Sequence, residues 1–207
     1  MGWRGGSVIG YWLPAHEILT MDAFLISTGL VALAEMGDKT QLLSLLLAAR
    51  FRQPVPILMA ILAATLLNHA LAAALGQWVT GLLGADVLRW VLGLSFLLMA
   101  GWMLIPDQLG DEEQSIARWQ RFGVLGTTFI LFFIAEIGDK TQIATVALAA
   151  RFDTLWTVLA GTTLGMMLAN APAVLIGDRM AGRLPLRAIH ALAALIFAVL
   201  GLWALLG

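Results

Sequence analysis

Two copies of one eight-residue string place charged side chains inside strongly apolar surroundings. The copies are residues 34–41 (AEMGDKTQ) and residues 135–142 (AEIGDKTQ), and seven of the eight positions agree. Each copy carries two carboxylates and one lysine. A charged side chain at the centre of a membrane helix costs about 2.5–3.5 kcal/mol on insertion scales. A chain that incurs this cost in both copies is expected to use these charges.

The acidic and amide side chains of the two copies offer a set of oxygen ligands for a metal ion. In a continuous helix, the two acids stand three residues apart and share a face, which the glutamine extends by a turn. Oxygen-rich, sulfur-free ligand sets suit hard divalent cations such as Mg²⁺, Ca²⁺ or Mn²⁺. The four carboxylates and two lysines sum to −2, which one divalent ion would neutralise. The predicted metal ligands are Glu35, Asp38, Gln41, Glu136, Asp139 and Gln142.

Other polar residues of the same segments are expected to support this site. Each lysine follows its glutamate by four residues, so we expect an intrahelical pair in which the lysine acts as an internal counter-ion. The threonines can add hydroxyl groups, and two asparagines occur at near-equivalent points of the two halves. The supporting residues are Lys39, Lys140, Thr40, Thr141, Asn68 and Asn170.

A glycine separates the two acids of each copy. Gly37 and Gly138 permit either close approach of a second helix or an unwound helix that offers carbonyl oxygens. Crowded, buried carboxylates should hold one or two protons when the site is empty, and an incoming divalent ion should displace them. This competition is the minimum mechanism for cation/proton exchange.

The composition indicates an integral membrane protein. Of the 207 residues, 60% are hydrophobic and 12% are charged, whereas about a quarter of a soluble domain is charged. The absence of cysteine excludes disulfides and thiolate metal sites. A net charge of −1 without a basic run gives no indication of nucleic acid binding. No metalloprotease, nucleophile-elbow or phosphate-loop motif occurs, so we expect neither enzymatic activity nor a cofactor.

Six apolar spans approach or reach the roughly 20 residues that cross a bilayer. They cover about residues 23–49, 57–80, 87–105, 122–150, 155–176 and 188–206, and the repeated string lies near the middle of the first and fourth. The predicted fold class is an all-α integral membrane protein with six transmembrane helices.

The repeat extends beyond the motif, because LAARF at residues 47–51 recurs at residues 148–152, again with an offset of 101. Two halves of three helices each therefore enter the membrane in opposite orientations, which predicts two inverted repeats with a site between them at the midplane. The predicted divisions are residues 21–105, a connecting loop at 106–121, and residues 122–207. Residues 1–20 form an N-terminal extension, either not native or a short interfacial segment.

Basic residues favour an orientation with both termini outside. With that orientation, the inner side carries seven arginines and the outer side three. The inner ones are Arg50, Arg52, Arg118, Arg121, Arg179, Arg183 and Arg187, and the outer ones are Arg4, Arg89 and Arg151.

The doubled motif Glu-x-Gly-Asp-Lys-Thr-Gln resembles that of the Gdt-type cation/proton exchangers, a family that includes bacterial MneA-type manganese exporters. The resemblance covers residues 21–207 and implies six helices that exchange Mn²⁺ or Ca²⁺ for protons. The family's motif acids match Glu35, Asp38, Glu136 and Asp139. The compact size resembles bacterial members, which implies manganese export across the inner membrane, with the periplasm outside. The implied partners are the cation, protons and the lipid bilayer, and a homodimer is compatible with them.

Other functions remain compatible with these residues. Ca²⁺/H⁺ exchange uses the same oxygen ligands, and rings of acids also line passive cation channels. Buried Glu–Lys and Asp–Lys pairs can also simply fasten helices together in a structural subunit. The lysines inside the motif and the inverted repeat favour a carrier.

Overall fold

The computed structural model describes residues 15–105, 112–152, 154–176 and 186–206, and these residues form helices and short connections without a strand. The first part of the chain contains α1 (Ala15–Glu35), α2 (Lys39–Phe51), α3 (Pro54–Leu82) and α4 (Ala85–Trp102). The second contains α5 (Glu112–Trp119), the 3₁₀ turn η1 (Gln120–Phe122), α6 (Gly123–Glu136), α7 (Lys140–Phe152), α8 (Leu155–Ile176) and α9 (Leu186–Leu206). The prediction of an all-helical protein is confirmed.

Helix length and composition give four to six candidate membrane spans. Four single helices, α3, α4, α8 and α9, are long and apolar enough to cross a bilayer. The other two candidates are bent pairs, α1 with α2 and α6 with α7, whose axes turn by 68° and 67°. The spans predicted at 23–49 and 122–150 are therefore not continuous helices. Each breaks at the repeated motif, where a glycine interrupts the apolar run.

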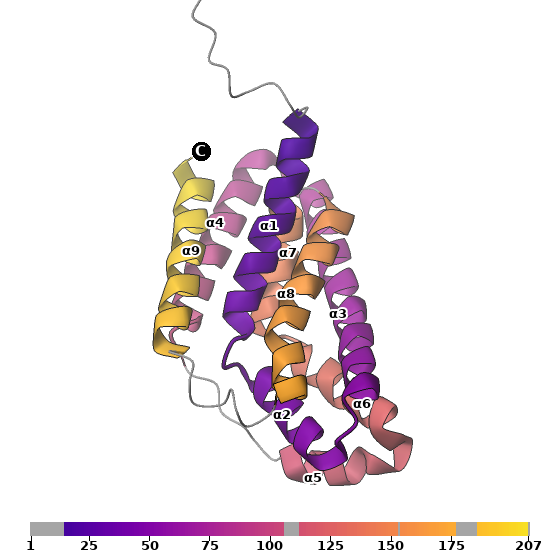
Figure 1. Cartoon of the computed structure of the whole chain (residues 1–207). Helices are drawn as coiled ribbons and strands as arrows, with labels where there is room; N and C mark the ends of the chain where they lie inside the picture. The colour runs from indigo at the N-terminus through magenta and orange to yellow at the C-terminus, as the bar shows by residue number, and fades with distance from the viewer. Residues whose placement is uncertain (1–14, 106–111, 153, 177–185, 207) are drawn as a thin grey trace, which may run out of the picture.

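Helices extend into two segments that were predicted as a connecting loop and an N-terminal extension, and the division of the chain stays a prediction. Residues 106–121 were expected to form a loop, but α5 and most of η1 lie in this segment, and residues 106–111 are outside the described part. The helix α5 lies across one end of the bundle, at the bottom of Figure 1. At the other boundary, α1 begins at Ala15, within the predicted extension of residues 1–20, whereas residues 1–14 are not described.

The long helices pack mainly against partners from the other half of the chain. Figure 1 shows α1 beside α8 and α4 beside α9, and α3 packs against α6, α7 and α8. Glycines make these approaches close. A Cβ atom at Gly165 of α8 would lie 2.6 Å from the Thr28 carbonyl oxygen, and one at Gly76 of α3 would overlap the Val146 carbonyl oxygen. Small residues are common where membrane helices pack closely.

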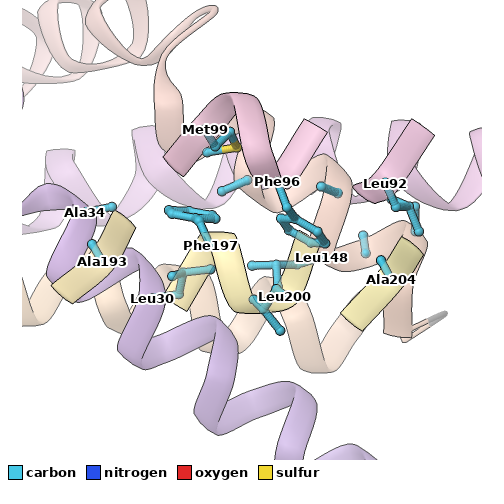
Figure 2. Packing of buried hydrophobic residues seen from close by; sticks show 14 of the residues in the cluster. Leu30, Ala34, Leu92, Phe96, Met99, Leu148, Ala193, Phe197, Leu200 and Ala204 are labelled. Carbon is cyan, nitrogen blue, oxygen red and sulfur yellow. The ribbon is translucent and has the colours of Figure 1, made fainter. Parts of the chain in front are cut away.

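A buried apolar cluster joins α4 and α9 to the middle of the bundle (Figure 2). The rings of Phe96 and Phe197 face each other with centroids 6.2 Å apart. Leu30 of α1 and Leu148 of α7 are buried in the same cluster. This packing connects both broken helices to α4 and α9, so the motif segments rest on a common core.

Candidate metal centre

The same backbone turn interrupts both copies of the motif. In the first, Gly37 has φ +83°, and the Asp38 amide donates to the Glu35 carbonyl oxygen at 3.1 Å. In the second, Gly138 has φ +75°, and the Asp139 amide donates to the Glu136 carbonyl oxygen at 3.2 Å. Glycine adopts this left-handed conformation without the Cβ clash of other residues. Both glycines interrupt their helices, and Gly37 also permits the close approach of Leu186 at the start of α9.

The turn places the two acids of each copy on different helices. Glu35 is the last residue of α1, whereas Asp38 precedes the first residue of α2. The prediction that both acids share one helical face is therefore wrong. An N-terminal helix end carries partial positive charge and a C-terminal end partial negative charge. The aspartates lie at the N-terminal ends of α2 and α7, where the partial positive charge stabilises a carboxylate. The glutamates lie at the C-terminal ends of α1 and α6, where the carbonyl oxygens favour a cation.

The glutamine of each motif accepts a hydrogen bond from the glycine at the turn of the same motif. The Gln41 Oε1 atom accepts a hydrogen bond from the Gly37 amide at 2.8 Å, and that of Gln142 accepts one from the Gly138 amide at 2.7 Å. The Gln41 amide group also donates to the Ala169 carbonyl oxygen of α8. These predicted ligands use their amide oxygens here to stabilise the turns.

Three of the four motif carboxylates converge on one point. Glu35, Asp38 and Asp139 each offer one oxygen, and the three atoms lie within 4.8 Å of one another. Oxygens separated by up to about 5 Å can share one ion bonded at 2.3–2.6 Å, as Ca²⁺ is. All three side chains are buried. Glu136 is also buried but is not a member of this group.

Each glutamate is held through one oxygen by the threonine of its own motif. The Thr40 hydroxyl donates to Glu35 Oε2 at 2.6 Å, and that of Thr141 donates to Glu136 Oε2 at 3.1 Å. The Oε1 atom of each glutamate is buried and accepts no hydrogen bond from the described residues. An unsatisfied buried carboxylate oxygen costs free energy, which a bound cation or a proton would offset.

Both lysines form ion pairs between the motifs. The Lys39 Nζ atom lies 3.1 Å from Asp139 Oδ1, and the Lys140 Nζ atom lies 3.5 Å from Asp38 Oδ1. The predicted pairing partner, the glutamate four residues earlier on a continuous helix, is replaced by the aspartate of the other copy. The side chain of Lys39 is 30% exposed, whereas that of Lys140 is 2% exposed.

The two asparagines connect the long helices to the second part of each broken span. Asn68 of α3 accepts from the Gln142 amide group at 3.4 Å and donates to the Phe133 carbonyl oxygen at 3.2 Å. Asn170 of α8 accepts from the Ser44 hydroxyl at 2.8 Å. They connect elements around the acids and are not members of the carboxylate group, and their supporting role stays a prediction.

Contacts from α9 to the first motif were not predicted. The His190 Nε2 atom lies 2.6 Å from the Met36 carbonyl oxygen, and Leu186 packs over Gly37. The second motif differs, because Gly138 is exposed and a Cβ atom there would have open space around it. The repeat gave no signal for His190, because the position 101 residues earlier is an arginine, Arg89.

A comparison with known families assigns this chain. The family model described as divalent cation/proton antiporter GDT1 matches residues 23–111 and 124–207. The chain belongs to the GDT1 family. The match covers both copies of the motif, and it confirms the resemblance inferred from the sequence. The family is one of transporters, and no enzymatic activity is part of its description.

Curated relatives agree with this assignment over most of their length. A Vibrio cholerae protein named "Putative manganese exporter" is 54% identical over 198 residues, which cover 95% of this chain and 96% of the relative. A GDT1-like protein of Synechocystis is 29% identical over 88% of this chain and 98% of its own. The yeast protein named divalent cation/proton antiporter GDT1 is 23% identical, over 88% and 82%. No solved structure matches the chain.

Proposed function

We propose that this GDT1-family member exports a divalent cation, most readily Mn²⁺, in exchange for protons at a site formed by the two motifs. The observation that carries the proposal is the convergence of Glu35, Asp38 and Asp139, whose oxygens lie within 4.8 Å of one another in a buried position. The name of the Vibrio relative supports manganese as the cargo, and the ligand chemistry is compatible with it.

The exchange follows from a competition between the cation and protons to compensate the charge of the buried acids. The free Oε1 atoms of Glu35 and Glu136 can each take a proton when the cation is absent. A divalent ion compensates the charge of the acids more completely, and the protons then leave. The cation and the protons therefore occupy the site alternately, which is the condition for obligatory exchange.

The lysines halve the negative charge of the empty site. Two carboxylates pair with Lys39 and Lys140, so the remaining charge of −2 corresponds to the two glutamates. That charge matches one divalent ion or two protons. Because each pair joins one motif to the other, the pairs also hold the two halves of the site together.

We also propose that the halves, residues 21–105 and 122–207, are inverted repeats around this site. The similar bends of 68° and 67° and the reciprocal packing of α1 with α8 and of α3 with α6 support this arrangement. For orientation, the end of the bundle that carries α5, Arg50 and Arg121 would face the cytoplasm of a bacterial inner membrane, by the positive-inside rule.

Transport in proteoliposomes tests the site. With a proton gradient imposed, the unmodified protein should move Mn²⁺ with counter-movement of protons. Glu35→Gln and Asp139→Asn should each reduce this flux by about 100-fold, because either change removes a ligand charge at a buried site. Glu113→Gln, which neutralises an exposed acid on α5, is the matched control and should keep the flux.

Two results would contradict the proposal. Undiminished Mn²⁺ flux in both site variants would remove the site assignment. Mn²⁺ flux without proton movement would indicate a channel instead of an exchanger. Competition between Mn²⁺ and Ca²⁺ in the same vesicles decides the preferred cargo, and we expect Mn²⁺ to suppress Ca²⁺ uptake at the lower concentration.

A further inference from the structure

A second charged hollow lies at the end of the bundle opposite α5. A cavity of about 550 Å³ opens between the start of α4, the end of α7 and the last turns of α9. In Figure 1 these three helix ends lie near the C-terminus at the top of the molecule, whereas α5 lies at the bottom. The cavity lining includes none of the motif residues, so it is separate from the candidate metal centre.

Two arginines line this cavity without an acidic partner. Neither Arg89 of α4 nor Arg151 of α7 forms an ion pair with the described residues. The Arg89 Nε atom is buried and donates no hydrogen bond to them. Asp86 is the acidic residue of the lining, so the lining carries a net positive charge. A buried guanidinium donor without an acceptor is costly, and an anion in the cavity would satisfy it.

The arginine equivalent to Arg151 in the first half of the chain has a side-chain hydrogen-bond acceptor. Arg50 is its counterpart in the repeat, and the two residues occupy the last turns of α2 and α7. Arg50 donates to the Gln120 side chain at 3.0 Å and lies in a hollow that Glu113 of α5 also lines. No described residue accepts a hydrogen bond from Arg151, although Asp86 lines the same cavity. A group beyond the described residues can therefore play the part that Gln120 plays for Arg50.

The position of the cavity favours a lipid as this group. The Arg151 guanidinium stacks over Trp203, 4.2 Å from the ring centroid, and Trp203 is about half exposed. Tryptophan is enriched at the headgroup level of membranes. Apolar residues, among them Leu88 and Leu92, complete the lining. The start of α4 adds the partial positive charge of a helix N-terminus, which favours phosphate.

We propose that this cavity binds the phosphate of a phospholipid headgroup, held by Arg89 and Arg151, with the glycerol and upper acyl chain against the apolar lining. The proposal does not depend on the transported ion. It assigns to the chain a lipid site on the face opposite α5, which is the outer face in the proposed orientation.

Native mass spectrometry of the purified full-length protein in detergent tests this site. Phosphatidylglycerol, phosphatidylethanolamine and diacylglycerol, which lacks the phosphate, are titrated separately. We expect both phospholipids to bind and diacylglycerol not to bind. Arg89→Gln and Arg151→Gln should each weaken phospholipid binding about tenfold, because each removes a charge-assisted hydrogen bond. Arg118→Gln, which removes an exposed charge on α5, should leave binding unchanged.

Further measurements separate loss of the lipid site from loss of folding. Arg151→Gln also removes the stacking on Trp203, so its thermal unfolding is measured alongside that of Arg89→Gln, which loses no such contact. Equal binding by both cavity variants and the unmodified protein would overturn the proposal, as would an equal loss in Arg118→Gln. Displacement of the lipid by millimolar inorganic phosphate would indicate a site for soluble anions and would also overturn it.

Discussion

At the scale of single residues, the candidate site depends on pairs that cross between the two motifs. Lys39 pairs with Asp139, and Lys140 pairs with Asp38, at 3.1 and 3.5 Å. Removing one partner of a buried ion pair is strongly destabilising, because it leaves the other charge uncompensated. Exposure to solvent reduces this effect. The two lysines differ in exposure, 30% against 2%, and should therefore differ in their contribution to stability.

We predict that Lys140→Met destabilises the protein by about 3–5 kcal/mol, the range for breaking a buried ion pair. Lys39→Met should cost clearly less, because water reaches its side chain. Thermal unfolding in detergent, with and without Mn²⁺, measures both effects. The double variant Lys140→Met with Asp38→Asn restores the charge balance and should recover part of the lost stability. Equal losses for the two lysines would contradict the assigned burial.

The sequence allowed these residues to be found but not their pairing. Six charges in apolar segments are unusual on their own, so the composition and the repeat were enough to select the motif acids and lysines. The expected intrahelical pairs assumed an unbroken helix, in which residues four apart are neighbours. Once Gly37 and Gly138 break the helices, that neighbour relation is lost, and the opposite motif supplies the partner. Contacts such as that of His190 with Met36 arise only from packing.

At the scale of elements, the two glycine turns position the site but differ in their surroundings. Gly37 and Gly138 have nearly the same φ, +83° and +75°. A Cβ atom at Gly37 would lie 2.9 Å from the methyl carbons of Leu186, whereas one at Gly138 would meet no atom within 4 Å. The start of α9 therefore covers the first turn, and among the described residues no element covers the second turn in the same way.

We predict that Gly138→Ala destabilises the protein by about 1–2 kcal/mol, the cost of a left-handed conformation for a residue with a Cβ atom. Gly37→Ala should cost more, because Leu186 must also move. Adding Leu186→Ala to Gly37→Ala should therefore reduce the difference between the two glycine variants. Thermal unfolding provides the measurement.

Gly29→Ala is the matched control for these variants. Gly29 lies inside α1, and a methyl group added there would meet open space, so alanine should be neutral or stabilising by up to about 1 kcal/mol. If Gly138→Ala behaves like Gly29→Ala, the positive φ in the second motif is wrong.

The sequence predicted that the elements are helices better than it predicted where the helices break or end. Apolar runs near 20 residues identified the six candidate spans, because the bilayer thickness sets their length. A glycine between two acids is compatible with close packing or with an unwound turn, and hydrophobicity does not distinguish them. The sequence therefore did not predict which of the two roles, close packing or a bend, the glycines have. The helix α5 was expected as a loop because the segment is short and polar, although Ile116 anchors it to the buried core.

At the scale of the whole molecule, the inverted arrangement that we propose depends on three spans per repeat. An odd number of spans would turn the second half over relative to the first, and equivalent connections would then lie on opposite faces of the membrane. Gln53 joins α2 to α3, and Thr154, 101 residues later, joins α7 to α8. In Figure 1, α3 begins near α5 at the bottom of the bundle, whereas α8 begins at the top. A parallel repeat would place them on the same face.

The cysteine-free sequence makes this inversion directly testable by labelling. We predict that a membrane-impermeant maleimide, applied to whole bacterial cells, labels Trp156→Cys at the exposed start of α8 but not Gln53→Cys, and that both react after the membranes are opened. The exposed Gly84→Cys, which precedes α4, should react from outside like Trp156→Cys, and Ala117→Cys of α5 should be protected like Gln53→Cys. The unmodified protein, which has no thiol, gives the background. Labelling of Gln53→Cys and Trp156→Cys from the same side would exclude inverted repeats, whereas the opposite pattern for all four positions would reverse only the proposed orientation.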